Sequence, residues 1–237
     1  MKIVGIIPSR MESKRLPGKP LLKIGGKSMI QRVYEASIKC NNLNDVYVAS
    51  DNDEIINHVK LFGNFIKTSS KPINGTERVY EAYLKLQKKY DFIINIQGDE
   101  PFIKSNQIND LIQICNKKND ICTLIKEHKY SDKLNKNSVI KVVMNKDNEA
   151  MYFSRSLIPN NNKNTLYNTH IGIYGYKPSV LSKLVELKPS SLEIAESLEQ
   201  LRWIENNFKI KVAKTNHDSF CIDTKNDWKV ANEIVKT

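Results

Sequence analysis

Short apolar runs alternate with longer amphipathic stretches along the first hundred residues. The run KIVGIIP at residues 2–8 is β-branched and closed by proline, as a buried strand would be. VYVAS at 46–50 and DFIINIQ at 91–97 have the same character. Between these runs, residues 29–40, 53–61 and 76–90 have apolar positions at helical spacing. Strands that alternate with helices predict an α/β fold with a mostly parallel sheet covered on both faces.

The pattern changes in the second half of the chain. ICTLIKEH at 121–128, SVIKVVMN at 138–145 and HIGIYGYK at 170–177 predict antiparallel strands, and the Asn-rich residues 160–168 predict an exposed, mobile loop. Residues 192–206 predict one helix, followed by short strands at 210–215 and 220–224 and a closing helix. No repeat or linker interrupts the chain, so we expect one compact domain over residues 1–237.

Composition places the chain among cytoplasmic proteins. Hydrophobic residues make up 40% of it, and no apolar run approaches the roughly 18 residues that span a bilayer. Pro8 and Arg10 interrupt the N-terminal apolar run without a cleavage site, which favours a strand over a signal peptide. The four cysteines are scattered without a CxxC pair, as reduced core thiols would be, and they predict no disulfide or zinc site.

The formal net charge is +11, from 37 Lys+Arg against 26 Asp+Glu. Such an excess suggests nucleic-acid binding, but the cations are spread along the chain without interleaved aromatics, so we expect no nucleic-acid partner. The rival hypothesis, a basic nucleic-acid-binding protein, predicts tight and steeply salt-dependent retention of DNA or RNA. Only six of the cations are arginines, and Arg10 and Arg15 share one loop. A planar bidentate donor in a lysine-rich chain points to an anion.

That loop, SRMESKRLPGKP at residues 9–20, carries Arg10, Arg15 and Lys19 directly after the first strand. Ligands of parallel sheets bind outside the carboxyl ends of the strands, which here end in Ser9-Arg10, Ser50-Asp51 and Gly98-Asp99. A triphosphate needs backbone N–H groups from a glycine-bearing turn and cations for the leaving pyrophosphate. The P-loop pattern GxxxxGK[ST] is absent. Spacing alone therefore leaves both a triphosphate-binding loop and a solvated basic loop open.

Seven motifs in order carry a specific resemblance to a known family. They are IIPSRMESKRLPGKPL, GTER (75–78), NIQGDEP (95–101), YFSR (152–155), HIGIYGY (170–176), LEQLR (198–202) and IDT (222–224). The set resembles the 3-deoxy-manno-octulosonate (Kdo) cytidylyltransferases and covers residues 3 to about 226. The first loop alone is typical of the wider sugar nucleotidyltransferases. The later motifs narrow the resemblance to this family.

The resemblance implies a three-layer αβα nucleotidyltransferase domain with a small antiparallel region, in which a sugar-binding and dimerisation subregion spans roughly 120–205. It implies a homodimer that needs Mg²⁺ and transfers CMP from CTP to the anomeric hydroxyl of Kdo, releasing pyrophosphate, for lipopolysaccharide synthesis. It implies catalytic roles for Arg10, Lys19, Asp99 and Asp223, and magnesium ligation by Asp99 and Asp223. Nucleotide-binding residues would be Arg10, Arg15, Lys19, Ser50, Gly75, Thr76, Arg78 and Asp99. Sugar-binding residues would be Gln97, Arg155, His170, Tyr174, Glu199 and Gln200.

The implied roles suit the residue types, although each residue also has a simpler interpretation. Two carboxylates suit a hard cation, and an arginine such as Arg155 suits a sugar carboxylate. Without the resemblance, His170 reads as a structural histidine and Asp223 as a helix cap. Glu199 and Gln200 read as a solvated helix face on which Arg202 pairs with Glu199.

The chain departs from the family pattern at Asn160, which follows Ile158-Pro159 where an aromatic residue is common, and the following loop is short. A cytidylyltransferase for another acidic sugar, such as 8-amino-8-deoxy-Kdo, is therefore an alternative. A uridylyl- or guanylyltransferase for a sugar phosphate is a further one, but it would place basic residues where His170, Glu199 and Gln200 stand.

Overall fold

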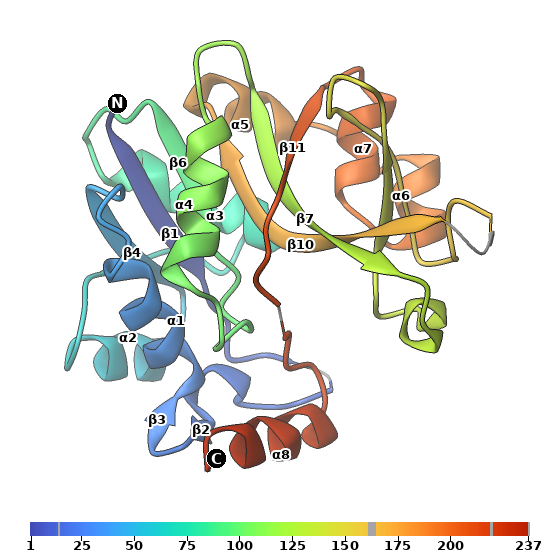
Figure 1. The fold of residues 1–237 in the computed structure, drawn as a ribbon. Coiled ribbons are helices and arrows are strands. Elements are labelled where there is room, and N and C mark those ends of the chain that lie inside the picture. The colour runs from blue at the N-terminus through green and yellow to red at the C-terminus, as the bar shows by residue number, and fades with distance from the viewer. Residues whose placement is uncertain (14, 161–164, 219, 237) are drawn as a thin grey trace. The chain divides into compact units, whose positions relative to one another are not determined.

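The computed structural model describes residues 1–13, 15–160, 165–218 and 220–236. These residues form two compact units, the first made of residues 1–108 and 219–237 and the second of residues 109–218 (Figure 1). The second unit includes the subregion expected over residues 120–205. Most of the Asn-rich segment, residues 161–164, lies outside the described residues, so the predicted mobile loop is not characterised.

The first unit is built on four parallel strands. They are β1 (Ile3–Pro8), β4 (Asp45–Ser50), β5 (Phe65–Lys67) and β6 (Phe92–Asn95), in the order β6-β1-β4-β5. Ile3, Val4, Ile6 and Ile7 of β1 are at most 2% exposed, because β1 has a strand on each side and helices on both faces. Continuous apolar runs are what a sheet covered on both faces requires.

Three helices cover this sheet in two layers. They are α1 (Met29–Ile38), α2 (Asp53–Val59) and α3 (Gly75–Lys85). The chain moves outward from β1 through β4 to β5 and then returns to β6, so right-handed crossovers place α1 and α2 on one face and α3 on the other. Figure 1 shows this arrangement. Each helix starts at a side-chain cap, from Ser28, Asn52 and Asn74 respectively. The predicted α/β fold with a mostly parallel sheet is confirmed.

The C-terminal residues complete the first unit. After the short helix η1 (Lys19–Leu21), strands β2 (Lys23–Ile24) and β3 (Lys27–Ser28) form a hairpin against which α8 (Lys225–Ile234) packs. Gly25 lies at φ 54°, and a Cβ there would come within 2.2 Å of Val235. Leu16, Ile24, Met29, Ile222 and Ala231 form one buried cluster. This cluster holds the loop after β1 beside residues that follow it by about 200 positions.

The second unit is mainly antiparallel. Its strands are β7 (Ile121–Lys129), β8 (Lys141–Met144), β9 (Ala150–Ser154), β10 (Leu166–Tyr176) and β11 (Ile210–Lys214). β7, β10, β8 and β9 pair antiparallel in that order, and β11 pairs parallel to the other edge of β7. The helices are η2 (Asp132–Asn135), α5 (Pro178–Leu184), α6 (Ser191–Glu196) and α7 (Gln200–Glu205). Helix α4 (Ser105–Ile114) crosses the boundary between the units.

Two sequence-based predictions are wrong. The single helix expected over residues 192–206 is the pair α6 and α7, because Ser197 has φ 51°, a left-handed conformation that ends α6. The strand expected over 220–224 does not form. Ile222 donates one backbone bond to the Asp99 carbonyl at 2.9 Å, and Thr224 already caps α8. In both places a capping interaction overrides the local apolar pattern.

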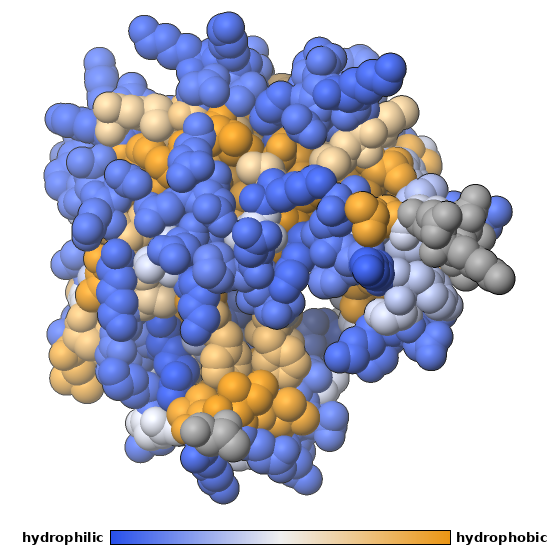
Figure 2. All heavy atoms as spheres, in the orientation of Figure 1, coloured by the Kyte–Doolittle hydropathy of each residue, from blue (hydrophilic) through white to orange (hydrophobic). Residues whose placement is uncertain are grey.

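The face drawn in Figure 2 is covered mostly by hydrophilic residues with smaller apolar areas between them. This agrees with a chain in which 27% of residues are charged. Among the described residues, none of the helices has both the length and the apolar character needed to cross a membrane.

One buried ion pair in the second unit gives a test of the fold. Arg202 forms a two-pronged contact with Glu193, with Nε–Oε2 at 2.6 Å and Nη2–Oε1 at 2.5 Å. The two side chains are 6% and 15% exposed. Burial, the largest influence, would raise the pKa of Glu193. The hydrogen bonds from Arg202 and from the Ser190 N–H, together with the charge of Arg202, outweigh it, so the pKa is lowered.

We expect Arg202→Met to lower the free energy of unfolding by about 3–5 kcal/mol, because it leaves a poorly solvated carboxylate without its cation. Lys67→Ala is the control, since Lys67 and Asp53 form a pair whose side chains are 57% and 70% exposed. It should cost at most about 1 kcal/mol. Urea unfolding of both variants measures the difference, and equal losses would contradict this assignment.

Candidate active site

The first unit contains a cavity of about 480 Å³ at the carboxyl ends of β1 and β6. The loop after β1, the start of α3, the turn after β6 and one residue before α8 line it. The lining residues are Pro8, Ser9, Arg10, Glu12, Ser13, Arg15, Lys19, Pro20, Pro72, Asn74, Gly75, Arg78, Gln97, Gly98, Asp99 and Asp223. The parallel-sheet rule predicted this location.

The loop after β1 brings three cations to the cavity. Gly18 has φ 69°, which a residue with a side chain rarely adopts, and the turn there leads into η1 with Lys19 as its first residue. Leu16 is buried in the cluster of the first unit, so it anchors the middle of the loop. Arg10, Arg15 and Lys19 all line the cavity. The sequence therefore located these three residues correctly.

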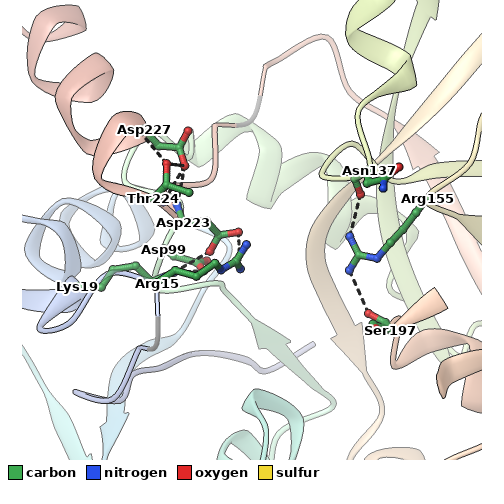
Figure 3. Close-up of polar contacts among 9 residues, drawn as sticks. All are labelled: Arg15, Lys19, Asp99, Asn137, Arg155, Ser197, Asp223, Thr224 and Asp227. Carbon is green, nitrogen blue, oxygen red and sulfur yellow. Dashed lines mark hydrogen bonds and ion pairs between the residues drawn. The ribbon is translucent and has the colours of Figure 1, made fainter. Parts of the chain in front are cut away.

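Asp99 and Asp223 lie together, although 124 positions separate them in the sequence. The Lys19 ammonium contacts Asp99 Oδ2 at 2.8 Å and Asp223 Oδ1 at 3.1 Å, and Arg15 Nη2 contacts Asp223 Oδ2 at 3.0 Å. Figure 3 shows Arg15 and Lys19 reaching toward both carboxylates. The sequence predicted this proximity, although it assigned Asp223 to the end of a strand that does not form.

The cap of α8 fixes the position of Asp223. Asp227 Oδ2 accepts hydrogen bonds from the backbone N–H of Asp223 at 3.1 Å and of Thr224 at 2.8 Å. Thr224 Oγ1 in turn accepts from the N–H of Asp227 at 3.2 Å, which completes a reciprocal cap. Figure 3 shows this group directly beside the carboxylates. The TKND sequence at 224–227 carries the capping signal, so this support was detectable from sequence.

The charges of Asp99 and Asp223 shift the pKa values of the neighbouring Lys19 and Cys221. Burial alone would lower the pKa of Lys19, but Asp99 and Asp223 outweigh it and the pKa is raised. Burial, followed by the charges of the two aspartates, raises the pKa of the Cys221 thiol. Lys19 is therefore a cation at neutral pH, whereas Cys221 remains a neutral thiol.

The two carboxylates fit a divalent metal ion. One ligand atom from each of Asp99, Cys221 and Asp223 lies within 4.8 Å of the others. Carboxylate oxygens suit a hard cation, whereas a protonated thiol does not. Asp99 and Asp223 are therefore the residues that would hold the ion.

Two predicted nucleotide-binding residues, Ser50 and Thr76, are buried and are not among the residues that line the cavity. Gly75 and Arg78, at the start of α3, line the cavity. Ser50 is fully buried and accepts a hydrogen bond from the Asn52 N–H at 3.2 Å, and Thr76 is 3% exposed. Neither Ser50 nor Thr76 is among the lining residues.

The sequence-based reading missed Pro72 and Asn74, which line the cavity next to GTER. Asn74 caps α3 by accepting from the Glu77 N–H at 2.8 Å. The NxxE spacing of Asn74 and Glu77 is a capping signal that would have identified it. Pro72 carries no comparable signal.

Of the six predicted sugar-binding residues, Gln97 belongs to the first unit and lines the cavity. The other five, Arg155, His170, Tyr174, Glu199 and Gln200, belong to the second unit. His170 Nε2 lies 3.0 Å from Thr123 Oγ1, and burial lowers the pKa of His170 to about 3, so its ring is neutral. The Tyr174 ring packs 5.3 Å from that of His170. Gln200 is 6% exposed at the start of α7, and Glu199 occupies the N-cap position of the same helix.

Arg155 has a structural task in the second unit. Its guanidinium donates to three backbone carbonyls, those of Glu196 at 2.6 Å, Asn137 at 2.8 Å and Ser197 at 3.2 Å. Figure 3 shows the contacts to Asn137 and Ser197. Two of the three carbonyls belong to the end of α6, where helical partners run out. Arg155 therefore fixes the break between α6 and α7.

Comparisons with known proteins agree with this geometry. The model of a family described as cytidylyltransferase matches residues 4–210. A 3-deoxy-manno-octulosonate cytidylyltransferase from Parabacteroides distasonis is 48% identical, with 98% of this chain and 97% of that protein covered. A mitochondrial enzyme of that name from Arabidopsis thaliana is 41% identical, with 99% and 83% covered.

Solved structures give the same result. A CMP:2-keto-3-deoxy-manno-octonic acid synthetase complexed with CTP matches with a TM-score of 0.92 at 35% identity, covering 100% of this chain and 99% of the other. A putative glucose-1-phosphate thymidylyltransferase from Bacillus anthracis shares the fold, with a TM-score of 0.70 at 18% identity over 99% and 95% of the two chains. The cytidylyltransferase family model and the structure in complex with CTP suggest that a divalent metal ion takes part. The resemblance detected in the sequence is confirmed: this chain belongs to the 3-deoxy-manno-octulosonate cytidylyltransferase family.

Proposed function

We propose that this chain transfers CMP from CTP to the anomeric hydroxyl of Kdo and releases pyrophosphate, as a step that supplies lipopolysaccharide synthesis. The observation that carries the proposal is the convergence of Asp99 and Asp223 with Lys19 in a cavity that Arg10 and Arg15 also line. Relatives named for this reaction match over nearly the full chain. They do not favour the alternative of 8-amino-8-deoxy-Kdo, because their names specify Kdo itself.

The residues of the first unit suit a triphosphate. Arg10, Arg15 and Lys19 supply positive charge for the phosphates and for the pyrophosphate that leaves. Asp99 and Asp223 hold Mg²⁺, whose chemistry is to polarise the α-phosphate and to favour ionisation of the attacking hydroxyl. Orienting both reactants for in-line attack contributes about 7–11 kcal/mol in favourable cases.

The second unit is proposed to bind the sugar and to form a homodimer, with Arg155, His170, Tyr174, Glu199 and Gln200 as its sugar-contacting residues. Gln97, which lines the cavity of the first unit, is also proposed to contact the sugar. A neutral His170 suits hydrogen bonding to sugar hydroxyls better than pairing with a phosphate. We further propose that the enzyme works in the cytoplasm, where CTP is available.

We expect CTP to be preferred over UTP, ATP and GTP by about 10- to 100-fold in kcat/KM, the range that one good bidentate contact to a base gives. Pyrophosphate release with Kdo as acceptor measures the preference. Equal turnover of all four nucleotides would exclude the cytidylyltransferase assignment.

We expect Arg10→Ala and Lys19→Ala each to lower kcat by about 10²–10³, the usual effect of removing one preorganised charge. Arg10 is exposed, so its loss should leave the melting temperature near that of the wild type. Lys19→Ala leaves Asp99 and Asp223 facing each other, so a divalent ion should recover part of any loss in stability.

The control for these variants is Lys23→Ala, which removes an exposed cation outside the cavity. Steady-state kinetics and thermal melting measure both properties. A variant that melts well below the wild type with normal kcat would identify a structural residue.

We expect Asp99→Asn and Asp223→Asn to reduce kcat strongly while the Kd for CTP changes much less, because Arg10 still binds the phosphates. Both substitutions remove a ligand of the same ion, so the double variant should be little slower than either single variant. Asp218→Asn is the control, since its carboxylate is 84% exposed and pairs with Lys126. Strictly multiplicative losses would mean that the two aspartates act separately.

A further inference from the structure

Arg78 is held by one of its nitrogens. Its side chain is 5% exposed, although it lines the cavity. Nη1 donates to Thr68 Oγ1 at 2.6 Å and to the Ser69 carbonyl at 3.3 Å, and it forms an ion pair with Asp51 Oδ1 at 3.1 Å. These acceptors directly follow β4 and β5. Two strand ends therefore fix the orientation of one side chain from α3.

The opposite edge of the guanidinium remains available. A guanidinium can donate in parallel from Nε and Nη2 to two acceptors in its plane. In Arg78 neither of these nitrogens bonds to any residue that the structure describes. A ligand in the cavity with two adjacent acceptors would satisfy both.

The charge balance indicates which kind of group this edge meets. Asp51 neutralises Arg78, so the pair carries no net charge toward the cavity. Arg10 lines the same cavity, and no acidic residue in the described part of the chain pairs with it. An unpaired guanidinium suits a phosphate, whereas a neutralised one suits a polar group without charge. The base and the ribose of a nucleoside triphosphate both carry no charge, but only the base presents two acceptors side by side in one plane, as the two parallel donors of a guanidinium require.

We propose that Asp51 is a positioning residue for base selection, which holds Arg78 so that Nε and Nη2 face N3 and O2 of cytosine. This inference rests on the proposed function. Cytosine presents two adjacent acceptors there, but uracil carries a hydrogen on N3, so a donor would face a donor. A buried donor left without an acceptor is costly, and the arrangement therefore disfavours UTP.

Asp51 has a second effect through its charge. Without the carboxylate, Arg78 carries an uncompensated charge beside a bound triphosphate, and the nearest phosphate competes with the base for its donors. Selectivity then falls because the phosphates of CTP and UTP are identical. Asp51 needs no contact with the nucleotide for this role, since it acts through Arg78.

The test is Asp51→Asn, assayed with CTP and UTP in the presence of Kdo and Mg²⁺. We expect the CTP:UTP ratio of kcat/KM to fall about tenfold or more, the lower value of a bidentate base contact. The change should lie in KM for CTP, with kcat less affected. Asp53→Asn is the matched control: it removes a carboxylate two residues away that is 70% exposed and pairs with Lys67. Its ratio should equal that of the wild type.

Two further variants test the same inference if Asp51→Asn does not fold. Thr68→Val removes another acceptor of Nη1 and should lower the ratio less, and Arg78→Lys keeps the charge but removes the fork and should lower it more. An unchanged ratio in Asp51→Asn, with or without a lower melting temperature, overturns the inference. Equal weakening of CTP and UTP also overturns it, because the edge then contacts phosphate. A wild-type protein that does not prefer CTP contradicts the proposed function itself.

Discussion

The contact on which the active site depends is the ammonium of Lys19 between two carboxylates. Asp99 and Asp223 come from opposite parts of the chain, and two carboxylates this close repel each other in a partly dry site. Lys19, 15% exposed, balances that repulsion in the protein without substrates. Apolar packing also holds the two carboxylates in place. Leu16 and Ile222 pack into one core, which keeps the loop after β1 and the C-terminal segment together.

The backbone positions the side chains that form the site. Strand ends deliver Arg10 and Asp99, a left-handed glycine starts the short helix at Lys19, and a reciprocal cap fixes Asp223. Local geometry therefore sets where each of these side chains begins. The long-range contacts of Lys19 with the two aspartates and of Leu16 with Ile222 then hold the separate segments together in one preorganised site.

The sequence predicted the core of the first unit and its cavity because both depend on strong local signals. Buried runs located β1, β4 and β6, and the rule for parallel sheets placed Arg10 and Asp99 at one edge. Prediction from the sequence failed where a helix cap competes with an apolar pattern. The residues around Ile222 look like a strand, and Ser197 interrupts what looks like one helix. It also failed to separate lining residues from supporting ones. Thr76 follows the cavity residue Gly75, and Ser50 ends a strand of the same sheet, but both are buried and neither lines the cavity. Only the three-dimensional path of the strand or helix distinguishes these cases.

The first unit is discontinuous in sequence, and this has a consequence for synthesis. A ribosome makes residues 1–108 first, then the whole second unit, and only at the end the segment with Ile222 and Asp223. Until that segment emerges, the cavity wall of the nascent chain has Asp99 without Asp223, and the apolar surface of Leu16, Ile24 and Met29 lacks the cover that Ile222 and Ala231 provide. A growing chain therefore lacks one of the two proposed metal ligands, and apolar surface exposed in this way makes an incomplete chain prone to aggregate.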